Sequence, residues 1–328
     1  MKSLMSGLAA AAAGVVLGAA VASTAVAAEY PARPIQIIVP YNAGGGTDLS
    51  TRLFAQALEK ALNGTAVVRN QPGGGGSIGT SATAHAKADG YTIGTGSQGP
   101  IAMLPHYGGI DYTINDFDFL ALQARNLMVI GVGKNAPFQD AKGFFEYAKA
   151  HPGELTVGNS GAGGANHIAM EGLAMAAGVK VKSMPFGGAV AAVTAVLGGH
   201  IQAAVASPAE FLTHVRAGNI TPILVMEDAR IEQYPDTPTA KELGVDFAWS
   251  SWKGIVAPKG LPKDVRAKLA AGVEKALKDP TYVEKMKELG EFLDYRPGDK
   301  YEALARHDSE IAEKVIRSLG MYGMNAKK

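Results

Sequence analysis

The chain has 328 residues, and its 31 Lys and Arg residues nearly balance its 30 Asp and Glu residues. This balance offers no basic surface for nucleic acid, and the absence of cysteine excludes disulfides, thiolate metal sites, a cysteine nucleophile and a lipidated N-terminal cysteine. Once an N-terminal leader is set aside, roughly 300 residues remain, a length that predicts two lobes or one large domain.

The N-terminal segment has the pattern of a secretory signal peptide. Lys2 precedes an apolar run over 8–22, and Ala25-Val26-Ala27 supplies the small-x-small pattern of a cleavage site. The apolar run is too short for a typical membrane span, although an uncleaved anchor is the alternative interpretation. We therefore expect residues 1–28 to be removed on export to the periplasm. The sequence contains no second apolar run of membrane length, so a role in transport would require a separate permease.

The rest of the chain predicts an α/β fold. Short β-branched runs alternate with amphipathic segments, a pattern typical of parallel sheets covered on both faces. The first strand is expected at 35–39, and further strands are expected at 65–68, 91–95, 119–122, 128–132, 181–184, 201–206, 220–225 and 254–257. The last third is expected to be helical, with apolar patterns over 265–277 and 301–319.

The first glycine-rich loop, residues 40–48 (PYNAGGGTD), runs from a strand-like stretch into a helix-like one. Backbone N–H groups of such a loop and of the helix N-terminus favour a bound anion. Asp48 would repel a second carboxylate, so we expect it to hold an ordered water or a ligand ammonium. A capped strand-to-helix turn without a ligand is the alternative.

Two other glycine runs resemble nucleotide motifs without completing them. Residues 70–79 (NQPGGGGSIG) lack the lysine of a phosphate loop, so a structural turn or a wall of the cleft is the better interpretation. Residues 94–99 (GTGSQG) match the dinucleotide spacing, but Pro100 and Pro105 interrupt the helix that should follow. Neither run predicts a nucleotide cofactor.

The second strong loop, residues 158–167 (GNSGAGGANH), also leads from a strand-like stretch into a helix. Neither strong loop contains Lys or Arg, so we expect neutral groups to hold the ligand. Ser160 does not fit a nucleophile elbow, because Ala162 stands where the second glycine is required. His167 and Glu171 share a helical face but belong to no metal motif, and no metal site is predicted.

Two long stretches, 119–133 and 247–258, contain few turn or helix signals. They predict two segments that cross between two lobes. The first lobe would then be discontinuous, with residues 29–125 and 253–328, and residues 126–252 would form an inserted second lobe. The second crossing contains Trp249 and Trp252, which are expected to line the cleft or to pack in the core.

The leader is followed by seven motifs, which together make a series of eight: YPARPIQIIVPYNAGGGTD, VVRNQPGGGGSIGT, KADGYTI, GNSGAGGANH, MPFGGAVAAVTAVLGGHIQAA, YPDTPTAKELG and WKGIVAPKGLP. In this order they resemble the Bug-type substrate-binding receptors of tripartite tricarboxylate transporters, over essentially the whole mature sequence. The resemblance implies a periplasmic two-lobe binding protein of the class II Venus-flytrap type. Such a protein closes over an organic acid and presents it to a permease of one large and one small membrane subunit, without catalysis and without a cofactor.

The resemblance also implies the ligand-binding residues. The two strong loops would clamp one carboxylate, partly through water near Asp48, and the second lobe would set specificity. The family more often has a tyrosine and then a basic residue where PFGG stands at 185–188, so we expect a mono- or dicarboxylate with a hydrophobic body, such as an aromatic acid, rather than citrate. The expected ligand-binding residues are Tyr41, Asn42, Gly45, Gly46, Thr47, Asp48, Gln98, Asn159, Ser160, Gly161, Gly163, Asn166, His167, Phe186, Gly187 and Ser207.

Two other function classes remain open from the sequence. One is an exported α/β hydrolase-like enzyme in which Ser160 or Asp48 performs chemistry, and it predicts turnover of the ligand. The other is a ligand sensor that signals to a membrane kinase rather than to a permease. The receptor itself is expected to be a monomer.

Overall fold

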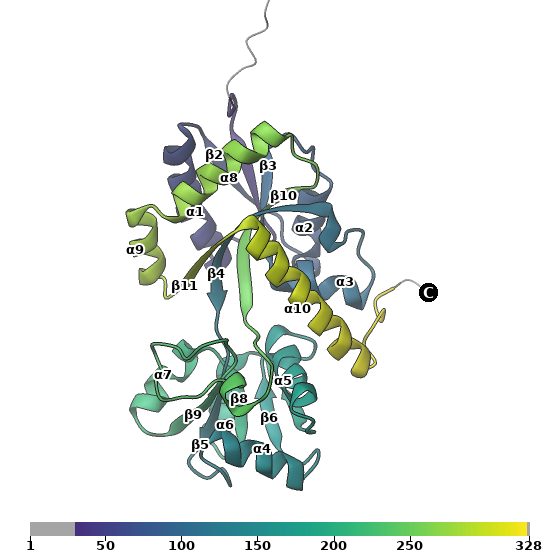
Figure 1. The fold of residues 1–328 in the computed structure, drawn as a ribbon, viewed down its shortest axis with the longest axis vertical. Helices are drawn as coiled ribbons and strands as arrows, with labels where there is room; N and C mark the ends of the chain where they lie inside the picture. Colours follow the sequence, from purple (N-terminus) through teal and green to yellow (C-terminus); the bar gives the residue numbers. More distant parts are fainter. Residues whose placement is uncertain (1–29, 327–328) are drawn as a thin grey trace, which may run out of the picture.

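The computed structural model describes residues 30–326, so the predicted signal peptide lies outside the described residues. Two lobes, one above the other in Figure 1, are each built on their own sheet. The first sheet has the strand order β11-β4-β10-β3-β1-β2, and the second has the order β7-β6-β8-β5-β9. The predicted two-lobe α/β fold is confirmed.

The first lobe is assembled from both ends of the chain. Its strands are β1 (Ile35–Val39), β2 (Ala66–Asn70), β3 (Thr92–Ser97), β4 (Phe117–Asn126), β10 (Ser251–Pro258) and β11 (Phe292–Pro297). Its helices are α1 (Gly46–Leu62), α2 (Ser77–Ala84), α3 (Leu104–Tyr107), α8 (Lys263–Leu277), α9 (Pro280–Glu288) and α10 (Gly298–Ser318). Short turns η1 (Gly74–Gly76) and η3 (Ile114–Asp116) and a π-helical turn η2 (Gly99–Met103) complete it.

The second lobe is one continuous stretch of chain. Its strands are β5 (Val129–Gly133), β6 (Thr156–Asn159), β7 (Lys182–Pro185), β8 (Ala203–Ala206) and β9 (Ile220–Val225). Its helices are α4 (Ala141–Ala150), α5 (Ala165–Ala176), α6 (Ala189–Leu197) and α7 (Pro208–Arg216), followed by the short turn η4 (Lys241–Leu243).

The sheets are mixed, whereas the sequence pattern predicted parallel ones. β1 pairs in parallel with β2 and β3, but β10 is antiparallel to both β3 and β4. In the second sheet, β5 is antiparallel to β8 and β9. The reason is the crossing between lobes: β4 leaves the first lobe and β10 returns to it, so the two neighbours must run in opposite directions.

The last third of the chain is not entirely helical, because β11 pairs with β4 at the edge of the first sheet. Its sequence, FLDYRP, lacks the alternation of apolar and polar residues that predicts a strand, and none of its residues is buried. An edge strand needs only one partner and little burial, so its sequence carries a weak signal.

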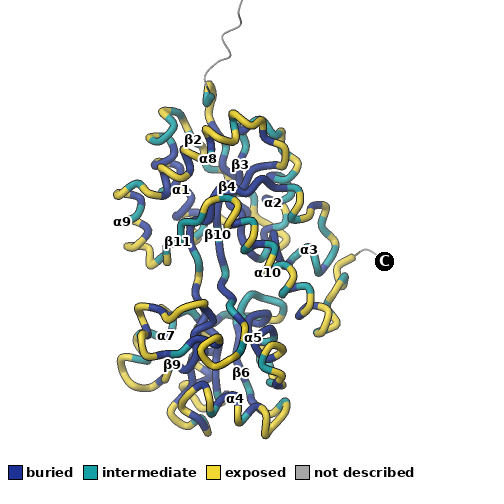
Figure 2. The backbone as a smooth tube through the Cα atoms, viewed as in Figure 1, coloured by how far each residue is buried: buried dark blue, intermediate teal, exposed yellow. Residues whose placement is uncertain are grey.

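Three segments connect the lobes. Figure 2 shows both crossing segments as buried chain, and Leu127, Met128 and Trp249 are each at most 3% exposed. The third connection is α10, which begins in the first lobe and packs Val315 and Ile316 into the core of the second lobe. Within residues 30–326, no helix combines the length and the apolar character needed to cross a membrane.

Candidate functional site

A cavity of about 380 Å³, which we call the front cavity, opens where β1 and β3 end in the first lobe. The loop after β1, the start of η2 and the two crossing strands form its walls. Five of the predicted residues belong to this lining: Tyr41, Gly45, Gly46, Thr47 and Gln98. Trp252, predicted to line the cleft or to pack in the core, also belongs to the lining. The structure adds lining residues that sequence reasoning missed, namely Ser97, Gly99, Ala124, Arg125, Asn126, Ser251, Lys253 and Glu291.

The N-terminus of α1 supplies the front cavity with unpaired N–H groups. The first hydrogen bond of this helix runs from Leu49 N to Gly45 O over 2.9 Å, so the N–H groups of Gly46 and Thr47 precede the helical ladder. A side-chain carbon placed on Gly45 would meet only one atom within 4 Å, Asn42 O at 3.7 Å, so the approach to this end of the helix is open. Such a helix terminus attracts an anion.

Asp48 faces the loop and is not part of the cavity lining. Its side chain is 2% exposed and accepts hydrogen bonds from Gly44 N at 2.8 Å, Arg52 Nε at 3.0 Å and Asn70 Nδ2 at 2.9 Å. Burial alone would raise the pKa of this carboxyl, but the bonds from Arg52, Gly44 and Asn70 outweigh it and hold the pKa below its ordinary value. Asp48 therefore positions the loop, and Arg52 compensates its charge.

Gln98 ties the cavity to the hinge. Its side chain is 1% exposed, and Nε2 donates to Ser250 O and to Asp308 Oδ2, both at 2.8 Å. Both amide hydrogens are thus engaged within the protein. Gln98 contributes to the cavity wall, and its donors are occupied in this arrangement.

The cavity lining carries charge that the glycine loops did not predict. Lys253 forms an ion pair with Glu291, and both side chains are less than one fifth exposed. Arg125 forms ion pairs with Glu227 and Asp294, and although burial lowers its pKa, these carboxylates outweigh burial and raise it. The two glycine loops contain no Lys or Arg, but the cavity beside the first loop does have charged side chains in its wall. A signal was present: two basic residues inside apolar crossing strands.

The second glycine loop lies in the other lobe, between β6 and α5, and its polar side chains bind the loop itself. Asn159 Oδ1 accepts from Gly161 N at 3.0 Å, and His167 Nδ1 accepts from Gly163 N at 2.9 Å. Asn166 Nδ2 donates to Val205 O at 2.9 Å. Burial lowers the pKa of His167, so its ring is neutral near pH 7. The groups left for a ligand are Ser160 and the first N–H groups of α5.

The remaining predicted residues also lie outside the front cavity lining. Phe186 N donates to Asn159 O at 3.0 Å, which fixes the segment after β7 beside the loop. Ser207 caps α7, with its hydroxyl 2.9 Å from Glu210 Oε2. A side-chain carbon placed on Gly187 would meet no atom within 4 Å of the described chain, and Asn42 is exposed.

The second glycine loop does not contribute to the front cavity, because none of the residues that line this cavity comes from that loop. One direct contact does join this loop to the first lobe: Tyr107 Oη donates to Gly163 O at 2.8 Å.

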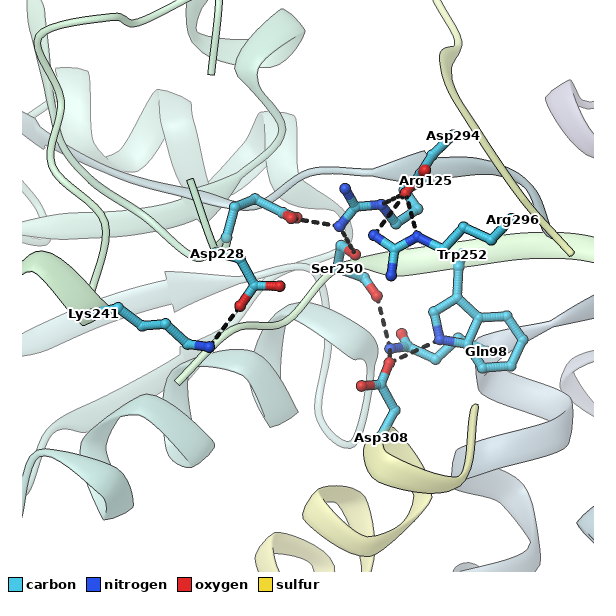
Figure 3. A network of polar contacts seen from close by, with 10 residues as sticks. Gln98, Arg125, Asp228, Lys241, Ser250, Trp252, Asp294, Arg296 and Asp308 are labelled. Carbon is cyan, nitrogen blue, oxygen red and sulfur yellow. Dashed lines mark hydrogen bonds and ion pairs between the residues drawn. The ribbon is translucent and has the colours of Figure 1, made fainter. Parts of the chain in front are cut away.

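A polar network crosses the hinge beside the cavity (Figure 3). Asp308 on α10 is 1% exposed and accepts from Gln98 Nε2 and from Trp252 Nε1, each at 2.8 Å. Burial raises the pKa of Asp308 to about 7. Arg125 joins the network through Ser250 Oγ at 3.3 Å. The network links both crossing segments to α10.

Comparison with known proteins identifies the family of this chain. Residues 50–321 match the model of the tripartite tricarboxylate transporter family receptor. The chain is 32% identical over 278 residues to Protein BugT of Bordetella pertussis, covering 82% of this chain and 85% of that protein.

Solved structures agree. A TctC solute binding protein from Polaromonas superposes with a TM-score of 0.83 at 32% identity, covering 88% of this chain and 99% of that one. A protein of R. palustris solved with adipate has a TM-score of 0.66 at 26% identity, covering 89% and 98% of the two chains. MatC from Rhodopseudomonas palustris, solved with bound malate, has a TM-score of 0.64 at 26% identity, covering 88% and 100%. The chain belongs to the tripartite tricarboxylate transporter family of receptors, and it has their solute-binding fold.

Proposed function

We propose that the protein is a periplasmic receptor that captures a small organic carboxylate between its lobes and delivers it to a tripartite tricarboxylate-type membrane transporter. The observation that carries this proposal is the front cavity, where the open N-terminus of α1 meets a wall built from the two crossing strands. The adipate and malate bound by the two relatives are small organic acids of the same class.

Closure of the cleft completes the binding site in this proposal. The ligand carboxylate binds at the N-terminus of α1 in the open form, and hinge rotation brings Ser160 and the N-terminus of α5 against the same molecule. Only in the closed form do both loops contact the ligand. The ligand therefore shifts the equilibrium between the open and closed forms towards the closed form. Phe186 offers an apolar surface to the body of the ligand, and we propose a mono- or dicarboxylate with a hydrophobic body.

The proposal includes no catalysis. The carboxylate of Asp48 is engaged by Arg52 and Asn70, and His167 Nδ1 is engaged by Gly163 N–H. Neither group is free to act as a general base for Ser160, which a hydrolase would require. These contacts favour the receptor over the exported enzyme.

The same proposal covers the export of the protein, its division into lobes and its partner in the membrane. Residues 1–28 act as a cleaved signal peptide, and the soluble receptor is not anchored by lipid. Residues 126–252 form the inserted second lobe, a division supported by the pairing of β4 and β10 in the first sheet. The receptor works as a monomer and docks on a permease with one large and one small subunit.

Calorimetric titration of the purified protein with adipate, malate, citrate, benzoate and phenylacetate tests the proposal. We expect saturable binding of at least one acid, weaker binding of citrate, and recovery of the unchanged acid after denaturation. Conversion of the acid would support the enzyme instead. Citrate binding far more tightly than the other acids would overturn the preference for a hydrophobic body, and binding of none would overturn the carboxylate receptor.

A further inference from the structure

One carboxylate of the protein already lies beside the proposed anion site. Glu291, in the short loop between α9 and β11, lines the front cavity together with Gly46 and Lys253. A side-chain carbon placed on Gly46, the first residue of α1, would lie 3.7 Å from Glu291 Oε1. The positive end of α1 therefore has an anion next to it before any ligand arrives.

The same carboxylate oxygen binds the one lysine in the cavity lining. Glu291 Oε1 accepts from Lys253 Nζ, and the two side chains are 16% and 13% exposed. Charges held this far from solvent interact more strongly than a surface pair, because less water screens them. Each partner keeps the other from binding a charged ligand.

Lys253 is placed to bind such a ligand. It lies on β10 opposite Ala124 of β4, so both crossing strands fix its backbone at the cavity wall. Its ammonium binds Glu291 Oε1, which also lies beside Gly46, so Lys253 and the start of α1 border the same part of the cavity. Lysine ammonium and a helix N-terminus both favour a carboxylate.

We propose that the N-terminus of α1 binds one carboxylate of the ligand in the front cavity, that Lys253 binds a second one, and that Glu291 is a built-in competitor which the second carboxylate must displace from Lys253. This inference deepens the proposed function and rests on it. It names a cation for the ligand, where the loops alone supplied neutral donors. It also predicts how strongly the site prefers dicarboxylates to monocarboxylates. The second carboxylate of a ligand can bind Lys253 only when Glu291 no longer occupies that lysine.

Titration with two acids of equal chain length, adipate and hexanoate, tests the proposal through the ratio of the hexanoate dissociation constant to the adipate dissociation constant. In Glu291→Gln the freed Lys253 should strengthen adipate binding by about tenfold and strengthen hexanoate binding less, so the ratio rises. In Lys253→Gln the ratio should fall below that of the unsubstituted protein. The double variant should resemble Lys253→Gln, because without the lysine there is no cation to release.

Two exposed residues provide matched controls. Glu288 on α9 is 61% exposed and pairs with Lys285, which is 51% exposed. Glu288→Gln and Lys285→Gln make the same chemical changes a few residues from the cavity and should leave both dissociation constants unchanged. General damage to the fold would weaken both acids alike and would leave their ratio constant.

The outcomes separate this inference from the function on which it rests. A hexanoate-to-adipate ratio of dissociation constants that is the same in the unsubstituted protein, Glu291→Gln and Lys253→Gln overturns the competitor role while the receptor stands. Weaker adipate binding in Glu291→Gln also overturns it, because Glu291 would then support the ligand. If neither acid nor any member of the wider panel binds any variant, the receptor proposal falls and this inference falls with it.

Discussion

Individual residues of the two glycine loops divide into those that face a ligand and those that hold the loop in shape. Gly45 and Gly46 leave the N-terminus of α1 open, whereas Asp48, Asn159 and His167 direct their polar atoms at neighbouring backbone. The two kinds of residue predict different effects of substitution: the first should change affinity, and the second should change stability.

Gly45 provides the cleanest test of affinity. Its φ is −78°, a conformation open to every residue, and a side chain there would point away from crowded atoms. We expect Gly45→Leu to weaken carboxylate binding by about tenfold or more through obstruction of the helix end, with a small change in melting temperature. Gly45→Ala should have a smaller effect, and equal affinity of both variants and the unsubstituted protein would contradict the assignment.

Gly163 is unsuitable for the same test, although it belongs to the predicted site. Its φ of +72° disfavours any side chain, and a carbon added there would lie 2.7 Å from Tyr107 Oη. A substitution would strain the loop and break its contact with α3. Any loss of affinity would then have two causes.

Asp48 should control stability. The pKa of its carboxyl is lower in the folded protein than its ordinary value of 3.8, so its ionised form stabilises the fold above that pH and the contribution is lost as the pH falls below it. We expect Asp48→Asn to lower the free energy of unfolding at pH 7 by about 1–3 kcal/mol and to flatten its decline in acid. Urea unfolding at several pH values measures both. Asp246→Asn, at a side chain that is 97% exposed, serves as the control, and equal stability of the two variants at pH 7 would refute the role of Asp48.

At the scale of elements, the crossing strands and α10 make the hinge, and sequence reasoning anticipated this only in part. Apolar runs revealed β1, β9 and the crossings, because buried strands need continuous β-branched residues. β11 was missed because an edge strand is polar and exposed. Glycine spacing located Gly45 and Gly46, since backbone donors are encoded locally.

The charged residues of the site could not be predicted from the sequence, for a different reason. Lys253 and Glu291 lie 38 positions apart, and no local motif relates them. Only the pairing of β10 with β4 and of β11 with β4 brings these segments to one cavity. Tertiary pairing of this kind has no periodic signature.

Asp308 gives the hinge a pH dependence that opposes that of Asp48. Its pKa of about 7 in the fold exceeds the ordinary value of 3.8, so the folded protein binds an extra proton and stability falls as the pH rises between these values. Asp308→Asn keeps an oxygen acceptor for Gln98 and Trp252 without the ionisation. The free energy of unfolding of the variant minus that of the unsubstituted protein should therefore increase by about 1–3 kcal/mol as the pH rises from 4 to 8. A difference that stays constant or shrinks over this range would contradict the buried-acid assignment.

The whole molecule consists of two lobes joined by the crossing strands and by the packing of α10 on α5. The second glycine loop does not line the front cavity in the arrangement described here, and the proposed function requires both loops to meet on one ligand. Closure is therefore the central claim about this protein.

The absence of native cysteine allows closure to be measured directly, because two introduced cysteines can be spin-labelled without interference. Glu284 on α9 and Arg216 on α7 are exposed positions, one in each lobe. In Figure 1, α9 and α7 lie on the same side of the molecule, one above the other. The measurement is the electron-spin distance between labels on Glu284→Cys and Arg216→Cys, without ligand and with saturating amounts of the acid that binds most tightly. We predict that the acid shortens the distance and narrows its distribution; an unchanged distribution with the acid bound would contradict closure of the lobes on the ligand.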